Sequence, residues 1–190
     1  WFFSADGMKS PEQIDAILKQ DITEDEIFGY MTRQNMDCYF DGDKLPGIRS
    51  EIAAVTEGIV FVYGVGAAYV QPSYDLLVYA DMARWEIQMR FRRNEVSNVG
   101  ISNREERASL QYKRAFFVDW RICDRFKKKL MKKWDYVLDT NTAGNPKMAT
   151  AKAIEAGLEK ASRTPFRVVP FFDPGPWGGQ WTVSYTHLTL

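Results

Sequence analysis

Two short, continuous apolar runs and a third that is interrupted only by Asp135 constrain the fold of this chain more than any other feature. They are Ile59–Tyr63, Leu76–Tyr79 and Trp134–Leu138, and they are rich in β-branched and aromatic residues. Unbroken apolar character over four or five residues is typical of strands that are buried on both faces of a parallel sheet. The sequence therefore predicts an α/β domain, with a parallel sheet flanked by helices.

Two helix starts are predicted near the beginning of the chain. Ser10 is a good N-cap and Pro11 suits the first helical position, while Ile14, Ile17 and Leu18 supply an apolar face. Thr23-Glu24-Asp25-Glu26 matches the Thr-x-x-Glu capping box, so it predicts a second helix.

Two further helices are predicted in the second half. Apolar residues recur at spacings of three and four and form one stripe of a long helix. They are Phe116, Trp120, Cys123, Phe126, Leu130 and Trp134. A last helix is predicted near residues 147–161, with Ala151, Ile154 and Leu158 facing inward.

A domain border is predicted near residues 162–176. Asp173-Pro174-Gly175-Pro176 stops regular structure, because proline fixes φ and lacks a donor N–H. Residues 1–161 then form the α/β domain, and residues 162–181 form a linker and the opening of a second domain. Residues 182–190 are expected to be a non-native tail, because Val183–Leu190 resembles translated sequencing-adapter sequence. The only histidine, His187, lies in that tail.

A candidate phosphate site begins at Asp81, which ends a predicted strand and precedes an arginine-bearing helix. Arg90, Arg92 and Arg93 are its candidate phosphate ligands, since guanidinium groups bind phosphate oxygens in pairs. This order resembles the later part of P-loop nucleoside and small-molecule kinases, in which residues 97–103 would be the lid loop. The alternative is that the arginines pair with neighbouring carboxylates.

The phosphate-cradling motif of such kinases, Gly-x-x-x-x-Gly-Lys-Ser/Thr, is absent from this sequence. A structural or regulatory module is therefore favoured over an active kinase, and the domain is expected to be incomplete at its N-terminus. Gly64-Val65-Gly66 also follows an apolar run. Tyr69 occupies the third glycine position of a dinucleotide-binding loop, so a turn at the sheet edge is favoured.

Pro176-Trp177-Gly178-Gly179 and its aromatic surroundings resemble the opening of class I mannose-6-phosphate isomerases, which are metal-dependent cupin enzymes. The preceding residues resemble the subgroup in which a kinase-like domain is fused to that isomerase, and the likeness covers about residues 20–181. The stretches that carry it are Ile27–Thr32, Val62–Ala67, Leu76–Glu86, Phe117–Arg121, Trp134–Thr142 and Phe166–Trp181.

This resemblance implies a parent enzyme that interconverts mannose 6-phosphate and fructose 6-phosphate with zinc. None of the zinc ligands can be placed in this chain, so the fragment itself is expected to be inactive. For the leading domain, the resemblance implies ATP or another nucleotide as the ligand.

The composition excludes some partners. Lysine plus arginine equals aspartate plus glutamate at 25 each, which gives no reason to expect nucleic acid. No apolar stretch is long enough to span a bilayer, and Cys38 and Cys123 lack metal-site spacing. A cytoplasmic protein without a membrane partner is expected.

Overall fold

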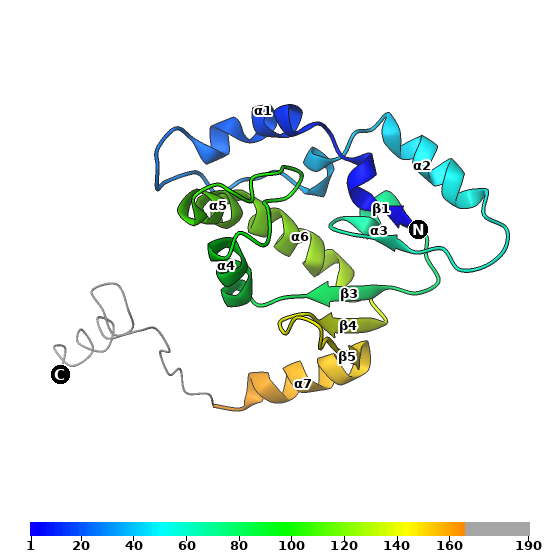
Figure 1. Ribbon diagram of the computed structural model, residues 1–190. Helices are drawn as coiled ribbons and strands as arrows, with labels where there is room; N and C mark the ends of the chain where they lie inside the picture. Colours follow the sequence, from blue (N-terminus) through cyan, green and yellow to red (C-terminus); the bar gives the residue numbers. More distant parts are fainter. Residues whose placement is uncertain (166–190) are drawn as a thin grey trace. The chain divides into compact units, whose positions relative to one another are not determined.

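Two small β-sheets organise residues 1–165, the part of the chain that the structure, a computed structural model, describes (Figure 1). Strand β1 (Phe2–Phe3) pairs in parallel with β2 (Val62–Tyr63). Strand β3 (Val78–Asp81) pairs in parallel with β4 (Tyr136–Asp139), and β4 pairs antiparallel with β5 (Lys147–Thr150). The fold is therefore mixed α/β, as predicted, but its strands are divided between two sheets.

The strands of the second sheet are not buried on both faces, which corrects the prediction. Along β3, exposed and half-buried residues alternate, and Val78 is 42% exposed. The inward set includes Tyr79, whose ring lies 5.2 Å from that of Trp134. Because side chains of a strand alternate between faces, this pattern indicates a sheet covered on one side along β3.

Helix α1 (Pro11–Ile22) begins where local signals place it. The Ser10 hydroxyl accepts a hydrogen bond from Gln13 N, and Gln13 Oε1 accepts one from Ser10 N, which completes a capping box. Ile14 and Leu18 are fully buried one turn apart. The predicted helix is confirmed.

The predicted second helix at Thr23 is wrong. Thr23 ends α1 with φ +60°, and the Asp25 carboxylate then accepts hydrogen bonds from the backbone N–H groups of Ile27 and Phe28. An aspartate side chain that binds amides two and three residues ahead forms a turn and competes with helix formation. The next regular elements are a 3₁₀ turn at Met36–Tyr39 and helix α2 (Lys44–Ala53).

The glycines after β2 make the predicted turn. Gly64 and Gly66 have φ of +109° and +77°, a region that side chains disfavour. A Cβ on Gly64 would lie 2.4 Å from Ser4 Oγ, so the close approach of the chain also requires glycine. Helix α3 (Ala67–Val70) that follows has four residues and is too short for a dinucleotide-binding crossover.

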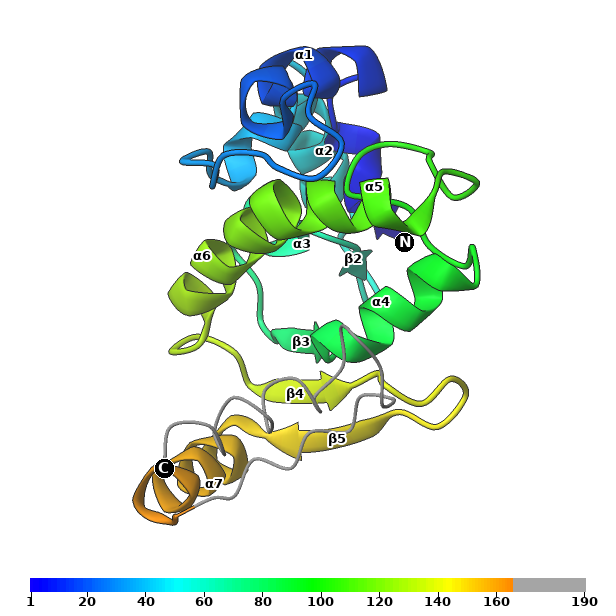
Figure 2. The same cartoon turned by 90° about the vertical axis from the view of Figure 1, so that its left-hand side faces the viewer.

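The predicted long helix is present as a continuous helical run with a change of winding. It consists of α5 (Ala108–Arg114), a π-helical segment (Ala115–Asp119) and α6 (Trp120–Leu130), and α4 (Arg84–Arg92) precedes it. Helices α4 and α5 contact each other (Figure 2). Three members of the predicted apolar stripe, Trp120, Leu130 and Trp134, are buried, which confirms that the stripe faces the core.

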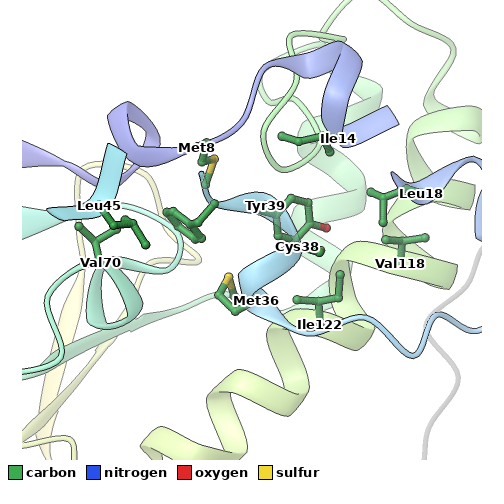
Figure 3. Close-up of a cluster of buried hydrophobic side chains, with 11 residues drawn as sticks. Met8, Ile14, Leu18, Met36, Cys38, Tyr39, Leu45, Val70, Val118 and Ile122 are labelled. Carbon is green, nitrogen blue, oxygen red and sulfur yellow. The ribbon is translucent and has the colours of Figure 1, made fainter. Parts of the chain in front are cut away.

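The main core lies between α1, the 3₁₀ turn and the long helical run (Figure 3). Tyr39, Val118 and Ile122 are fully buried there beside Ile14 and Leu18. A smaller cluster forms around Phe91, Ala115 and Trp120.

The chain divides into two units, Trp1–Ala151 and Lys152–Leu190. The predicted last helix is α7 (Ala151–Arg163), and residues 147–150, expected to be helical, form β5 instead. Of the expected inward face, Ala151 and Ile154 are half-buried, whereas Leu158 is 52% exposed, and α7 fully buries none of its side chains. No helix of residues 1–165 is long and apolar enough to cross a membrane.

Candidate functional site

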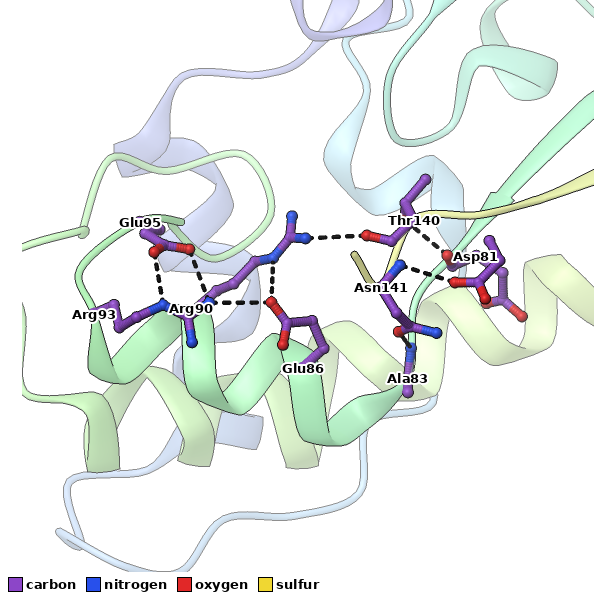
Figure 4. Close-up of polar contacts among 9 residues, drawn as sticks. Asp81, Ala83, Glu86, Arg90, Arg93, Glu95, Thr140 and Asn141 are labelled. Carbon is purple, nitrogen blue, oxygen red and sulfur yellow. Dashed lines mark hydrogen bonds and ion pairs between the residues drawn. The ribbon is translucent and has the colours of Figure 1, made fainter. Parts of the chain in front are cut away.

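The sequence-predicted Asp81 (Figure 4) lies at the carboxyl edge of β3, and the strand register places it opposite Asp139 of β4. This edge is where open parallel sheets bind ligands, because loops from neighbouring strands meet there. Asp81 Oδ2 accepts a hydrogen bond from Lys127 Nζ at 2.6 Å. The backbone oxygen of Asp81 accepts two more, from Thr140 N and Thr140 Oγ1.

The loop after β4 fixes the start of α4. Asp139 Oδ1 accepts a hydrogen bond from Asn141 N, and Asn141 Oδ1 accepts one from Ala83 N, both at 2.8 Å. Ala83 is the N-cap of α4 and has no capping side chain of its own. The two carboxyl ends and the helix start are therefore held together by short polar side chains.

Arg90 joins this edge through structural contacts. Its Nε donates to Glu86 Oε1 at 2.9 Å, and its Nη2 donates to the carbonyl oxygen of Thr140 at 3.0 Å. Because Arg90 donates to Glu86, the pKa of that carboxyl lies below its ordinary value. Arg90 thus links α4 to the end of β4.

Arg93 lies farther along α4, between two carboxylates. Its Nη2 is 3.0 Å from Glu86 Oε1, and its Nε is 2.6 Å from Glu95 Oε1. Hydrogen bonding to Glu95 and Glu86 raises the pKa of the Arg93 guanidinium, and Arg93 lowers the pKa of Glu95. Two of the three predicted phosphate ligands therefore already have carboxylate partners, which was the alternative that the sequence left open.

Arg92 points to a different place. Its side chain is exposed and lines a pocket between α4 and α5, together with Tyr112 and Lys113. No hydrogen bond or ion pair joins Arg92 to another residue of the described chain. The structure therefore places Asp81 and Arg90 at one edge, with Arg93 beside Arg90, and leaves Arg92 apart.

The loop expected to be a lid, residues 97–103, is anchored in the core. The Asn98 side chain is buried, and its Nδ2 donates to Asp119 Oδ2 at 2.7 Å and to the Gln111 carbonyl at 3.0 Å. Asn103 Nδ2 donates to Asn98 Oδ1. Side chains that close a lid over a ligand do not normally form such buried contacts, so this loop has a structural role here.

Asp119 is a buried carboxylate that the sequence reading missed. It ends the π-helical segment and accepts hydrogen bonds from Tyr39 Oη at 2.6 Å and from Asn98, while Arg114 Nε lies 3.9 Å away. Burial raises the pKa of Asp119, and the nearby Arg114 acts in the opposite direction. Its only local signal is a charged residue within the apolar stripe, where a charge requires buried partners.

The two cysteines offer no nucleophile. Burial raises the pKa of the Cys38 and Cys123 thiols to about 12, so both stay protonated at neutral pH. Within residues 1–165, no group of three or more histidine, cysteine, aspartate or glutamate side chains could hold a metal ion. The predicted isomerase motif, Pro176, Trp177, Gly178 and Gly179, lies outside the described residues, as does His187.

The comparisons with known proteins give one match. No curated protein and no solved structure matches the chain. A family model with the description Domain of unknown function (DUF8485) matches residues 1–163, which end where α7 ends. Because that match spans most of the sequence, the chain belongs to the DUF8485 family.

Proposed function

We propose that this chain is the leading part of a class I mannose-6-phosphate isomerase, and that its α/β unit is a kinase-like module without chemistry of its own. The isomerase assignment depends on the resemblance of Pro176–Gly179 and of the stretches before it. The parallel pairing of β3 with β4 and the position of Asp81 at a strand end favour a P-loop kinase-like fold for the module.

One observation carries the non-catalytic role. Arg90 and Arg93 donate to Glu86 and Glu95, and Asp81 pairs with Lys127. Phosphoryl transfer is stabilised mainly by charges directed at the ligand, and charges that are already paired within the fold are less available for that role. These side chains instead hold α4, α6 and the strand ends together.

Zinc in the proposed isomerase would polarise the carbonyl and hydroxyl groups of the sugar while a base moves a proton between carbons. The described residues provide no cluster that fits the ion. The reaction is therefore assigned to the parent protein, and no step of it is assigned to residues 1–165.

The test uses the full-length protein encoded at the same locus, supplied with zinc and mannose 6-phosphate. We expect fructose 6-phosphate to form, at a turnover that Arg93→Gln leaves unchanged within about twofold. Arg104→Gln, at an exposed position without a described partner, is the matched control. Absence of isomerase activity would overturn the isomerase assignment, whereas a large loss in Arg93→Gln alone would overturn the non-catalytic role.

A phosphotransferase or nucleotide-binding role is the second candidate. The observation that favours it is the register of β3 and β4, which places Asp81 opposite Asp139. Two carboxylates at the carboxyl edge of parallel strands are suited to a magnesium nucleotide. Titration calorimetry of the full-length protein with magnesium ATP separates the two roles. Saturable binding that Asp139→Asn abolishes would favour this candidate, and absence of heat would favour the module without chemistry.

A further inference from the structure

We infer that the pocket between α4, α5 and the loop after α1 binds a small organic anion with a planar apolar body. The pocket has a volume of about 550 Å³, which is within the usual range for small-molecule sites. Gln88 and Arg92 line it from α4, and Ser109 and Tyr112 line it from α5. These residues lie four and three positions apart on their helices, so each pair projects from one helix face.

The charge of the pocket favours an anion. Arg92 is exposed and has no hydrogen-bonding or charged partner among residues 1–165. Lys113 is only 5% exposed, and its Nζ donates to the backbone carbonyls of Thr23 and Asp25 instead of forming an ion pair. Its two acceptors are neutral carbonyl oxygens, so they satisfy hydrogen bonds of the ammonium group without balancing its charge.

The acidic residues nearby do not cancel this charge. Glu26 lines the pocket, but its carboxylate is 3.2 Å from the guanidinium of Arg107. The Asp25 carboxylate accepts hydrogen bonds from two backbone amides of its own turn. Among the residues that line the pocket, Arg92 and Lys113 are positive and Glu26 is negative, which leaves an excess of one positive charge.

The remaining surface of the pocket suits an apolar body. Phe91 is almost fully buried and lines the pocket together with Phe117. Tyr112, whose ring also contacts Phe116 and Trp120, is 38% exposed. Aromatic side chains favour flat partners, which can stack on the face of a ring. The side chains of Gln88 and Ser109 have no hydrogen-bond partner in the described part of the chain, so they are available to polar atoms of the ligand.

These observations define a ligand class: one carboxylate, sulfonate or phosphate group beside Arg92, attached to a ring system that lies on the aromatic surface. The inference does not depend on the isomerase proposal, because no residue of the strand edge lines this pocket. Failure of one proposal therefore leaves the other intact.

The test measures binding of two fluorescent probes of similar shape to the 190-residue chain. One is anilinonaphthalene sulfonate, an aromatic anion, and the other is N-phenyl-1-naphthylamine, its neutral analogue. Loss of a charge-assisted hydrogen bond changes affinity by about tenfold or more. We therefore expect Arg92→Gln to weaken binding of the anionic probe about tenfold and to leave the affinity for the neutral probe unchanged.

Two further variants serve as controls. Arg104→Gln removes an exposed arginine that does not line the pocket, and it should change neither affinity. Ser109→Phe fills the pocket from an exposed wall position and should weaken both probes. Circular dichroism establishes that each variant is folded.

Methyl NMR spectra then locate the probes. Shifts of Ile27 and Ala108, which line the pocket, are expected on addition of the anion. Shifts confined to other methyl groups, such as that of the exposed Ile59, would overturn the inference. Equal affinity of Arg92→Gln and the unmodified chain for the anion would also overturn it.

Discussion

The Asp119 carboxylate lies where the polar contacts of the core converge. Its two oxygens accept hydrogen bonds from Tyr39 and Asn98, and Arg114 lies close enough to balance its charge. Arg114 also pairs with Asp15 of α1 at 2.5 Å. A buried carboxylate with several donors fixes the relative position of the segments that supply them. Asp119 thus holds the helical run, the 3₁₀ turn and residues 97–103 in one arrangement.

Tyr39→Phe tests this network without changing the shape of the core. Loss of the hydroxyl removes one donor from a buried charge, and hydrogen bonds to charged groups contribute about 1.5–3 kcal/mol. We expect the free energy of unfolding, measured by urea denaturation, to fall by about that amount. Tyr30→Phe is the control, because Tyr30 is 70% exposed and its hydroxyl has no described partner. A change in Tyr39→Phe as small as that of the control would show that Asp119 does not need this donor.

Such a network could not be found from the sequence, because its partners are distant along the chain. Tyr39 and Asp119 are 80 positions apart, and neither residue type identifies the other. For the same reason, only part of the candidate site could be predicted. Asp81 was placed at a strand end from its local pattern, whereas the pairing of Arg90 with Glu86 and Thr140 depends on how α4 packs against the sheet.

At the scale of elements, prediction succeeded where the signals are local. Ser10 and Pro11 specify the start of α1, and all the signals for this start lie between Ser10 and Gln13. Residues 147–150 were predicted as helix because they adjoin a helical pattern, but hydrogen bonds to β4 draw them into a strand. Pairing with a distant strand outweighs local propensity, which is weak for so short a segment.

Helix α4 carries a small ion-pair network of its own, in which Glu86 contacts Arg90 and Arg93, so its stability should depend on pH. Arg90 lowers the pKa of Glu86 from an ordinary value of 4.5, with a further contribution from Arg93. A carboxyl whose pKa is lowered in the folded state stabilises that state at pH values above its ordinary pKa. This stabilisation is lost as the pH falls through the lowered pKa of the folded state.

Glu86→Gln removes that contribution. We expect the unmodified chain to be more stable than Glu86→Gln at pH 7, and the difference to close as the pH falls below about 4.5. Urea denaturation at a series of pH values measures it. Glu51→Gln, on an exposed position of α2 without a described partner, is the control and should show no such convergence. A difference that persists unchanged at low pH would mean that Glu86 acts through packing and not through charge.

At the scale of the whole molecule, exposed aromatic side chains and the absence of net charge both favour self-association. Trp1 stacks on Phe61 with ring centroids 4.5 Å apart, and Phe3 stacks on Tyr63 at 5.0 Å. All four are exposed, between 44% and 82%. The chain has no net charge at pH 7, so electrostatic repulsion between copies is weakest there.

We therefore expect self-association, measured by dynamic light scattering, to be greatest near pH 7 and to persist in high salt. Salt screens charges but does not weaken the association of apolar surfaces. Phe61→Thr interrupts the aromatic stack and should reduce the association at pH 7. Val55→Thr is the matched control, because Val55 is similarly exposed at 44% but belongs to no stack. If the stack were the cause, Phe61→Thr would associate less than Val55→Thr, because it alone interrupts the contiguous apolar surface. Equal association of both variants would mean that charge neutrality is the cause.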